Sequence, residues 1–202
     1  MENQDKKKAI IIEAALKRFA HYGLSKTTMT EIAKDVSFSK ALLYYYFPDK
    51  LSLYVSTIEH LMHVISRDLV KSIDKTNTTT EGIHKLLQKR QSFVQKYYTL
   101  LESTQVIGTE LPDDLHEKFS KARAFETIII SSLFNRGIAS GELEIEDVKL
   151  ATEIFIDALS GIHFNITAKD KNIFPEKEQF KQIFLKEKVF ADIFLKGLKP
   201  KS

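Results

Sequence analysis

Apolar residues recur at spacings of three and four along most of the chain, which is the periodicity of helices that bury one face. Glycine and proline, the residues that interrupt helices, number only seven and four among 202 residues. No segment has the strict apolar and polar alternation that is typical of strands. The pattern therefore predicts an all-α fold.

The first two predicted helices have recognisable ends. The first carries one apolar stripe and is expected to end near Gly23, a common helix-terminating residue. Thr28 and Glu31 have the spacing of a capping box, in which each side chain satisfies a backbone N–H group at the start of a helix. They predict a short second helix that continues to about Val36. The stripe of the first helix consists of Ile12, Ala15, Leu16 and Phe19.

A third short helix is predicted directly after the second. Ser39 is positioned to cap it, and it is expected to end near Phe47. Pro48 cannot continue this helix but suits the first turn of a fourth one. The fourth helix has a sustained apolar face, made of Leu51, Tyr54, Val55, Ile58, Leu61, Met62, Ile65 and Leu69.

The remainder of the chain is expected to form further long helices. Thr78 and Glu81 repeat the capping-box spacing, and Gly141 is positioned to close a helix. The last two predicted helices are rich in large apolar residues that one neighbouring surface would not cover. The expected ranges are 78–101, 112–139, 147–166 and 175–197.

The second and third helices, separated by residues 36–38, have the dimensions of a helix-turn-helix. Ala33 is small where the two helices would cross. Ile32, Phe38 and Leu43 are placed to lock them together and leave the opposite face of the third helix free for the major groove of DNA. Spacing alone leaves two interpretations open: a DNA-binding module, or an ordinary structural corner.

The net charge of +3 is concentrated in the first quarter of the chain. Residues 1–50 contain nine Lys and Arg against six Asp and Glu, whereas residues 51–202 contain 21 of each. This position favours the N-terminal quarter if nucleic acid is bound, although chance scatter explains so small a surplus equally well.

Composition excludes several function classes. The chain has no cysteine, which excludes disulfides, thiolate metal sites and cysteine nucleophiles and agrees with a cytoplasmic location. The first residues do not resemble a secretory signal, and no stretch is apolar enough to span a bilayer, so no membrane contact is predicted.

Enzymatic activity has no positive support in the sequence. A Gly-rich phosphate loop, a serine nucleophile motif and an acid cluster with metal-ligand spacing are all absent. His60 and His63 would share one helix face, but no third ligand of suitable spacing accompanies them. We therefore predict no catalytic residue, no metal and no cofactor.

A longer set of residues falls in register with a known DNA-binding domain. Over residues 9–55 the sequence closely resembles the N-terminal domain of TetR-family regulators. The segments 137–143 and 157–161 look more faintly like that family's loop before helix eight and helix eight itself. The matching residues are Ile11-Ile12-Glu13-Ala14-Ala15-Leu16, Phe19-Ala20, Gly23, Thr27-Thr28, Ile32-Ala33, Ser39-Lys40, Leu43-Tyr44-Tyr45-Tyr46-Phe47 and Lys50.

Three positions depart from the family pattern. Ser37 stands where the turn usually has glycine, and Ala41 stands where the recognition helix usually has glycine. Leu42 replaces the common threonine of that helix. The base preference of the family therefore does not transfer to this chain.

The resemblance implies a three-helix helix-turn-helix DNA-binding domain in residues 1–50 and a larger helical ligand-binding and dimerisation domain in residues 51–202. It implies a homodimer that binds a partly palindromic double-stranded DNA operator. An unidentified small-molecule effector would enter the C-terminal domain and release the DNA, with repression as the expected outcome. The alternative is a helical ligand-binding or interaction protein whose N-terminal motif is structural only.

The resemblance also implies the DNA contacts. A threonine at the start of the second helix would touch phosphate, residues of the third helix would face base edges or backbone, and Lys50 would neutralise a phosphate. Phe47 is expected in the core, and core packing is the alternative for the neighbouring tyrosines. The candidate residues are Thr27, Thr28, Ser39, Lys40, Ala41, Tyr44, Tyr45 and Lys50.

Phe93, Tyr97, Phe125 and His163 are the candidates for an effector cavity. Aromatic residues at helical spacing are more often simple core, and a satisfied buried or interface histidine is the alternative for His163. The two apolar C-terminal helices predict the dimer interface, which would place two recognition helices about 34 Å apart, one turn of DNA.

Overall fold

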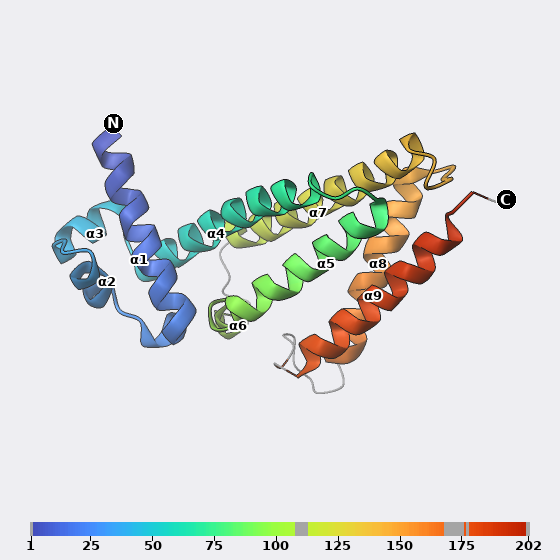
Figure 1. Ribbon diagram of the computed structural model, residues 1–202. Coiled ribbons are helices and arrows are strands. Elements are labelled where there is room, and N and C mark those ends of the chain that lie inside the picture. The colour runs from blue at the N-terminus through green and yellow to red at the C-terminus, as the bar shows by residue number, and fades with distance from the viewer. Residues whose placement is uncertain (1, 108–112, 168–175, 177, 201–202) are drawn as a thin grey trace. The chain divides into compact units, whose positions relative to one another are not determined.

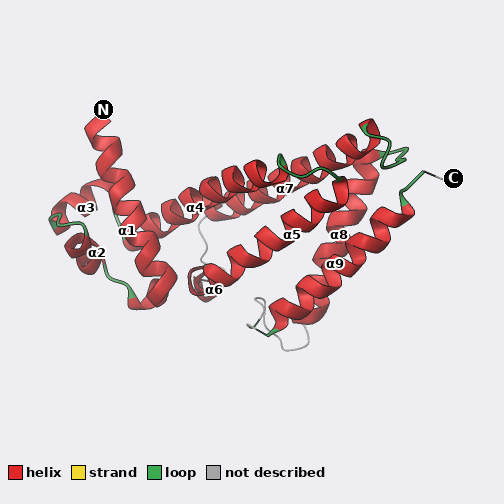
Figure 2. Cartoon of the chain, viewed as in Figure 1, coloured by secondary structure: helices red, strands yellow, loops and turns green. Residues whose placement is uncertain are grey.

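The computed structural model describes residues 2–107, 113–167, 176 and 178–200. Its regular elements in these ranges are all helices, joined by loops, which confirms the predicted all-α class (Figures 1 and 2). Among the residues described, no helix combines the length and hydrophobicity needed to cross a membrane. The helices are α1 (Glu2–Lys26), α2 (Met29–Asp35), α3 (Lys40–Tyr46), α4 (Lys50–Ile73), α5 (Thr79–Lys96), α6 (Tyr98–Ile107), α7 (Asp113–Ala139), α8 (Val148–Thr167) and α9 (Gln179–Gly197).

Most predicted helix boundaries are confirmed. Gly23 has a φ of 78° and interrupts α1, although the helix resumes as far as Lys26. Thr28 and Glu31 form the capping box: the Thr28 hydroxyl accepts from the Glu31 N–H, and the Glu31 carboxylate accepts from the Thr28 N–H at 2.9 Å. Ser39 caps α3 through the amide of Leu42.

Two boundaries differ from prediction. Pro48 is predicted in the first turn of the fourth helix, but α4 begins at Lys50, and the Asp49 carboxylate caps it by accepting from the Ser52 N–H at 2.6 Å. The predicted helix 78–101 is divided at Tyr97 into α5 and α6. The predicted starts of the helices at residues 112 and 175 lie outside the described residues.

The chain forms two compact units, and each is described by itself. The N-terminal unit comprises residues 1–65 and 96–119, and the C-terminal unit comprises residues 66–95 and 120–202. Compactness does not assign function, so the functional boundary after residue 50 stays a prediction.

The core of the N-terminal unit surrounds Tyr54. Its hydroxyl donates to the Leu100 carbonyl at 2.5 Å, and its ring meets the edge of Phe19 with centroids 5.3 Å apart. Burial raises the pKa of Tyr54, so the phenol stays protonated and keeps donating. Other fully buried residues of this core are Ile11, Ala15, Ile32, Leu43 and Leu53.

The C-terminal unit is built on a core of aromatic and aliphatic side chains from α5, α7, α8 and α9. Phe134 and Phe155 are fully buried at its centre and meet edge to face, with centroids 5.8 Å apart. Gly82 allows α5 to approach α7 closely, because a Cβ there would lie 2.4 Å from the Leu133 Cδ2. In Figure 1, α8 and α9 lie side by side in this unit.

The start of α5 is capped from a distant loop. Gly141, with a φ of 73°, ends α7, and the following Glu142 accepts from the Thr79 N–H at 2.7 Å. Burial opposes ionisation of Glu142, but the amides and hydroxyls of Thr79 and Thr80 outweigh it and hold its pKa below the ordinary value. A negative side chain at a helix N-terminus is stabilised by the helix dipole.

Candidate DNA interface and effector cavity

The helix-turn-helix is held together by residues buried between α2 and α3. Ile32 and Leu43 are fully buried, Ala33 is nearly so, and Phe38 is half-buried, as predicted for the crossing. The Phe38 N–H donates to the Ala33 carbonyl at 3.0 Å, which closes the turn. These contacts fix the orientation of α3 relative to α2.

Ser37 shows why glycine is usual at its position. Its φ is 55°, in the left-handed region, where a side chain is strained. Serine at this position therefore adopts the turn conformation that glycine usually provides, and its side chain adds strain to the backbone there.

One face of α3 is exposed to solvent. Lys40 and Tyr44 lie one helical turn apart on this face, and so do Ala41 and Tyr45. All four side chains are exposed, with Tyr45 at 68%. The Lys40 Nζ lies 5.7 Å from the centre of the Tyr44 ring. Phe47 is buried, as predicted. The face therefore presents one ammonium group and two phenol groups on a rigid helix.

The candidate hydroxyls at the start of α2 differ in exposure. Thr27 is fully buried, and its hydroxyl donates to the Gly23 carbonyl at 2.8 Å. Thr28 is exposed, and its hydroxyl donates to the Glu31 carboxylate at 2.7 Å. Ser39 is also exposed, at the start of α3. Thr28 and Ser39 are thus the candidate hydroxyls on the surface.

Lys50 is half-buried and already bonded. Its Nζ donates to the Leu24 carbonyl at 2.8 Å and to the Thr27 carbonyl at 3.1 Å. These bonds join the start of α4 to the last turn of α1 and to the residue that directly follows it. Sequence reasoning proposed only a phosphate partner for Lys50. Backbone carbonyls at the end of a helix have no partner within that helix and need donors from elsewhere. This general rule was the signal that could have predicted Lys50 as a donor to the end of α1.

Arg18 anchors α1 to α2, which the sequence analysis missed. Its guanidinium donates to both Asp35 carboxylate oxygens, at 2.5 and 2.9 Å, and lies 3.4 Å from Glu31. The hydrogen bonds from Arg18 lower the pKa of Asp35. Part of the positive charge in the first fifty residues is therefore neutralised within the motif.

His60 has a local partner. Its Nε2 lies 2.6 Å from the Glu13 carboxylate and links α4 to α1, whereas His63 is exposed. The described part of the chain contains no group of three or more side chains suited to hold a metal ion.

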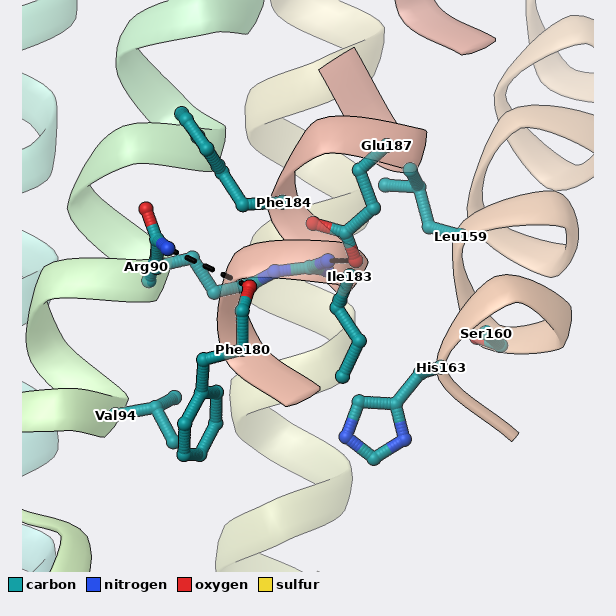
Figure 3. Close-up of a pocket in the computed structure, with 10 residues that line it drawn as sticks. Arg90, Val94, Leu159, Ser160, His163, Phe180, Ile183, Phe184 and Glu187 are labelled. Atoms are coloured by element: carbon teal, nitrogen blue, oxygen red, sulfur yellow. Dashed lines mark hydrogen bonds and ion pairs between the residues drawn. The ribbon is translucent and has the colours of Figure 1, made fainter. Parts of the chain in front are cut away.

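The C-terminal unit contains a partly open cavity of about 310 Å³ between α5, α8 and α9, a size within the ordinary range for small-ligand sites (Figure 3). Apolar and aromatic side chains form much of its wall, and polar groups project from all three helices. The lining residues are Arg90, Gln91, Val94, Leu159, Ser160, His163, Phe180, Ile183, Phe184 and Glu187.

Arg90 is the centre of the polar side of the cavity. Its guanidinium pairs with the carboxylates of Glu187, on α9, and Glu126, on α7, the latter at 3.0 Å. Glu187 is only 2% exposed, and burial and the nearby Glu126 raise its pKa, although Arg90 opposes this. Burial and the Arg90 charge lower the pKa of His163, which favours its neutral form.

Comparison with known proteins agrees with this geometry. Residues 11–57, which contain the α2–turn–α3 motif, match the profile of bacterial regulatory proteins of the tetR family. A transcriptional regulator from Cytophaga hutchinsonii has a similar structure, with a TM-score of 0.84 and 28% identity, over 96% of this chain and 99% of that one. The chain belongs to the TetR family. This is a family of regulatory proteins, not of enzymes.

The curated relatives of this TetR-family chain match over parts of their lengths. The uncharacterized HTH-type regulator YuxN of Bacillus subtilis is 32% identical over 53% of this chain and 35% of its own length. The biofilm operon negative regulator IcaR of Staphylococcus epidermidis is 26% identical over 53% of this chain and 60% of its own. The matches thus span less than two thirds of either relative.

Two further structures share the fold and contain ligands. FadR from Bacillus subtilis, solved with stearoyl-CoA, has a TM-score of 0.64 and 19% identity over 94% of this chain and 98% of that one. A protein from Saccharomonospora viridis, solved with choline, has a TM-score of 0.70 and 14% identity over 93% of this chain and 96% of that one. At these identities the likeness concerns the fold alone.

Only one of the four predicted effector residues of this TetR-family protein lines the cavity in Figure 3. His163 does so, whereas Phe93, Tyr97 and Phe125 do not. Tyr97 lies in the N-terminal unit. Sequence reasoning missed Arg90 and Glu187, which lie 97 residues apart and show no joint signal in the sequence.

Proposed function

We propose that this TetR-family regulator is a repressor that binds a partly palindromic operator in the cytoplasm and releases it when a small molecule binds. The observation that carries the proposal is the exposed face of α3, where Lys40, Tyr44 and Tyr45 project from a helix locked by buried contacts. Lysine ammonium and tyrosine hydroxyl groups bind phosphate, and lysine also donates to guanine in the major groove. Ser39 adds a hydroxyl at the start of α3, whereas the Thr28 hydroxyl at the start of α2 donates to Glu31 and would have to release it to bind phosphate.

The protein acts as a homodimer in this proposal, because α8 and α9 leave large apolar side chains in solvent. On each helix these residues recur at helical spacing and form a stripe, with Ile193 66% exposed. A second copy of the chain would cover both stripes by packing α8 and α9 of one subunit against those of the other. The exposed residues are Leu150, Ile154 and Phe164 on α8 and Leu185, Val189 and Ile193 on α9.

The effector site in this proposal is the cavity between α5, α8 and α9. Its size suits a small ligand, and its wall combines apolar side chains with a few polar groups. Structures of similar fold hold stearoyl-CoA and choline, which supports ligand binding as a use of this fold without defining the ligand class.

Selection of bound sequences from a random DNA pool tests the central claim. The enriched sequence is expected to be partly palindromic, with half-sites one helical turn apart. Lys40→Ala is expected either to relax one base position or to lower the slope of log affinity against log salt by about one. Lys149→Ala, on the exposed surface of α8, is the matched control and should change neither. No enriched sequence would instead support a purely structural N-terminal motif.

Lys50→Ala tests the remaining phosphate contact. If Lys50 neutralises a phosphate, the salt slope falls by about one. An unchanged slope with reduced stability would restrict Lys50 to its bonds with the Leu24 and Thr27 carbonyls.

Sedimentation equilibrium tests the dimer. Ile193→Glu is expected to give monomers, because it buries a charge in the proposed interface. Val64→Glu places the same charge at an exposed apolar position of α4 and should leave the dimer intact. Monomeric wild-type protein would contradict the assembly.

A further inference from the structure

The charges around the effector cavity do not balance. The guanidinium of Arg90 pairs with two carboxylates, those of Glu126 and Glu187. The imidazole of His163 adds no compensating charge, because burial and Arg90 both favour its neutral form. The cluster carries one negative charge in excess when both acids are ionised, and burial together with the nearby Glu126 raises the pKa of Glu187 as the cost of that excess.

The two acids meet Arg90 from different cavities. Glu126 lines a second cavity of about 290 Å³, which shares Arg90, Leu159 and Ser160 with the first one. Arg123, which also lines the second cavity, is exposed and lies 3.5 Å from Asp157. Arg90 pairs more closely with Glu187 than with Glu126, and Glu187 is the one of these two carboxylates that lines the first cavity.

The remaining wall of the first cavity suits a hydrocarbon group. Phe180, Ile183 and Phe184 on α9 and Leu159 on α8 line it, and Figure 3 shows Phe180 and His163 projecting into the same region from neighbouring helices. Aromatic faces also attract cations. A ligand with one positive charge and an apolar body matches this surface.

We propose that the cavity between α5, α8 and α9 binds an amphipathic organic cation, whose ammonium group lies beside Glu187 and whose hydrocarbon tail contacts Phe180 and Leu159. The assignment of such a cation as the effector rests on the proposed function. An anionic ligand is disfavoured, because it would add a third negative charge to one guanidinium or displace a buried carboxylate from it. Unpaired buried charge is costly.

Isothermal titration calorimetry of the full chain without DNA tests the assignment. Hexyltrimethylammonium is the probe, and hexanoate and 1-hexanol are the anionic and neutral probes of matched tail length. The cation is expected to bind at least about tenfold more tightly than either, the ratio that corresponds to about 1.4 kcal/mol. Tighter binding of hexanoate or hexanol, or no binding of the cation, would overturn the proposal.

Two variants locate the charge. Glu187→Gln is expected to weaken binding of the cation about tenfold by removing the facing carboxylate. Glu153→Gln, an exposed acid on α8 outside the cavity lining, is the control and should bind normally. Glu126→Gln gives an independent test if Glu187→Gln does not fold. It removes the second negative charge beside Arg90, so that Glu187 alone balances the guanidinium, and it should therefore also weaken binding of the cation. Unchanged affinity in a folded Glu187 or Glu126 variant would overturn the assignment.

The two proposals fail in distinguishable ways. A chain that binds the cation but does not release selected DNA in its presence keeps the ligand class and loses the effector role. A chain that binds DNA but not the cation keeps the regulatory function and loses the ligand class.

Discussion

The proposed DNA-binding face and the proposed effector cavity are built in opposite ways. The residues of the first lie within one short segment, 28–47, and its charged groups are largely exposed. The cavity gathers side chains from α5, α8 and α9, and its central pair, Arg90 and Glu187, is separated by 97 residues. A local motif is repeated from one sequence to another, whereas a cavity of this kind depends on how distant helices pack.

The two regions also treat carboxylates differently. Asp35, in the helix-turn-helix, is well solvated, and hydrogen bonds from Arg18 lower its pKa. Glu187, in the cavity, is desolvated, and burial raises its pKa despite Arg90. Exposed ion pairs contribute about 0 to 1 kcal/mol, but removal of one partner from a buried pair costs about 3 to 5 kcal/mol. We therefore expect removal of one charged partner to lower the free energy of unfolding more in the cavity than in the helix-turn-helix.

Arg90→Met is expected to have the largest effect. It leaves Glu187 buried without its cation and should lower the free energy of unfolding by about 3 kcal/mol at neutral pH. The loss should shrink in acid, because protonation removes the unpaired charge. Urea denaturation of the variant and the wild type, at neutral and at acidic pH, measures this loss of stability.

Matched variants make this prediction specific. Arg123→Met removes an exposed guanidinium, paired at 3.5 Å with Asp157, and should change stability by less than about 1 kcal/mol. The double variant Arg90→Met/Glu187→Leu should recover part of the loss. Equal losses from the two arginine variants would show that the cavity is no more sensitive than the surface.

The same contrast explains what the sequence predicted. The capping box of Thr28 and Glu31, the Ser39 cap and the burial of Phe47 are local features, and all are confirmed. The Glu142 cap on α5 joins residues 63 apart, and no local pattern announces it.

The candidate residues divide in the same way. The candidates Lys40, Tyr44 and Tyr45 share one exposed face because helical periodicity determines it. Among the effector candidates, aromatic content did not distinguish cavity from core, and only His163 lines the cavity. Tertiary packing decides which aromatic side chain is left with space beside it.

Tyr54→Phe is expected to be the more damaging of two matched changes in the N-terminal unit. It leaves the buried Leu100 carbonyl without the bond at 2.5 Å and should lower the free energy of unfolding by about 1 to 2 kcal/mol. Tyr22→Phe, at a half-exposed position, should change it by less than about 0.5 kcal/mol. Thermal denaturation of both variants measures the difference. A loss from Tyr54→Phe as large as that from Arg90→Met would contradict the proposed ranking of the regions.

The opposite pKa shifts predict opposite pH dependence. The contribution of Asp35 is present above its ordinary pKa of 3.8 and is lost as the pH falls through its lowered native value. Glu187 has a raised pKa, so its contribution is present below the ordinary value of 4.5 and is lost as the pH rises through the native value.

Stability measured from pH 3 to 8, in roughly one-unit steps, should therefore diverge between two variants. Relative to Asp35→Asn, the wild type should lose stability toward acid. Relative to Glu187→Gln, it should lose stability toward neutral pH. Parallel curves would mean that the two carboxylates share one kind of environment.

Ser37→Gly is expected to give the smallest effect and the only gain. Ser37 has a φ of 55°, and glycine enters this region without the steric conflict of a Cβ. The gain is partly offset because glycine makes the unfolded chain more flexible, so the free energy of unfolding should rise by about 0.5 kcal/mol. Ser37→Ala is the control, since it keeps the Cβ and should show no gain. If both variants changed stability equally, the hydroxyl and not the backbone would determine the effect. A gain confined to glycine would mean that even this locally determined motif departs from its most stable sequence.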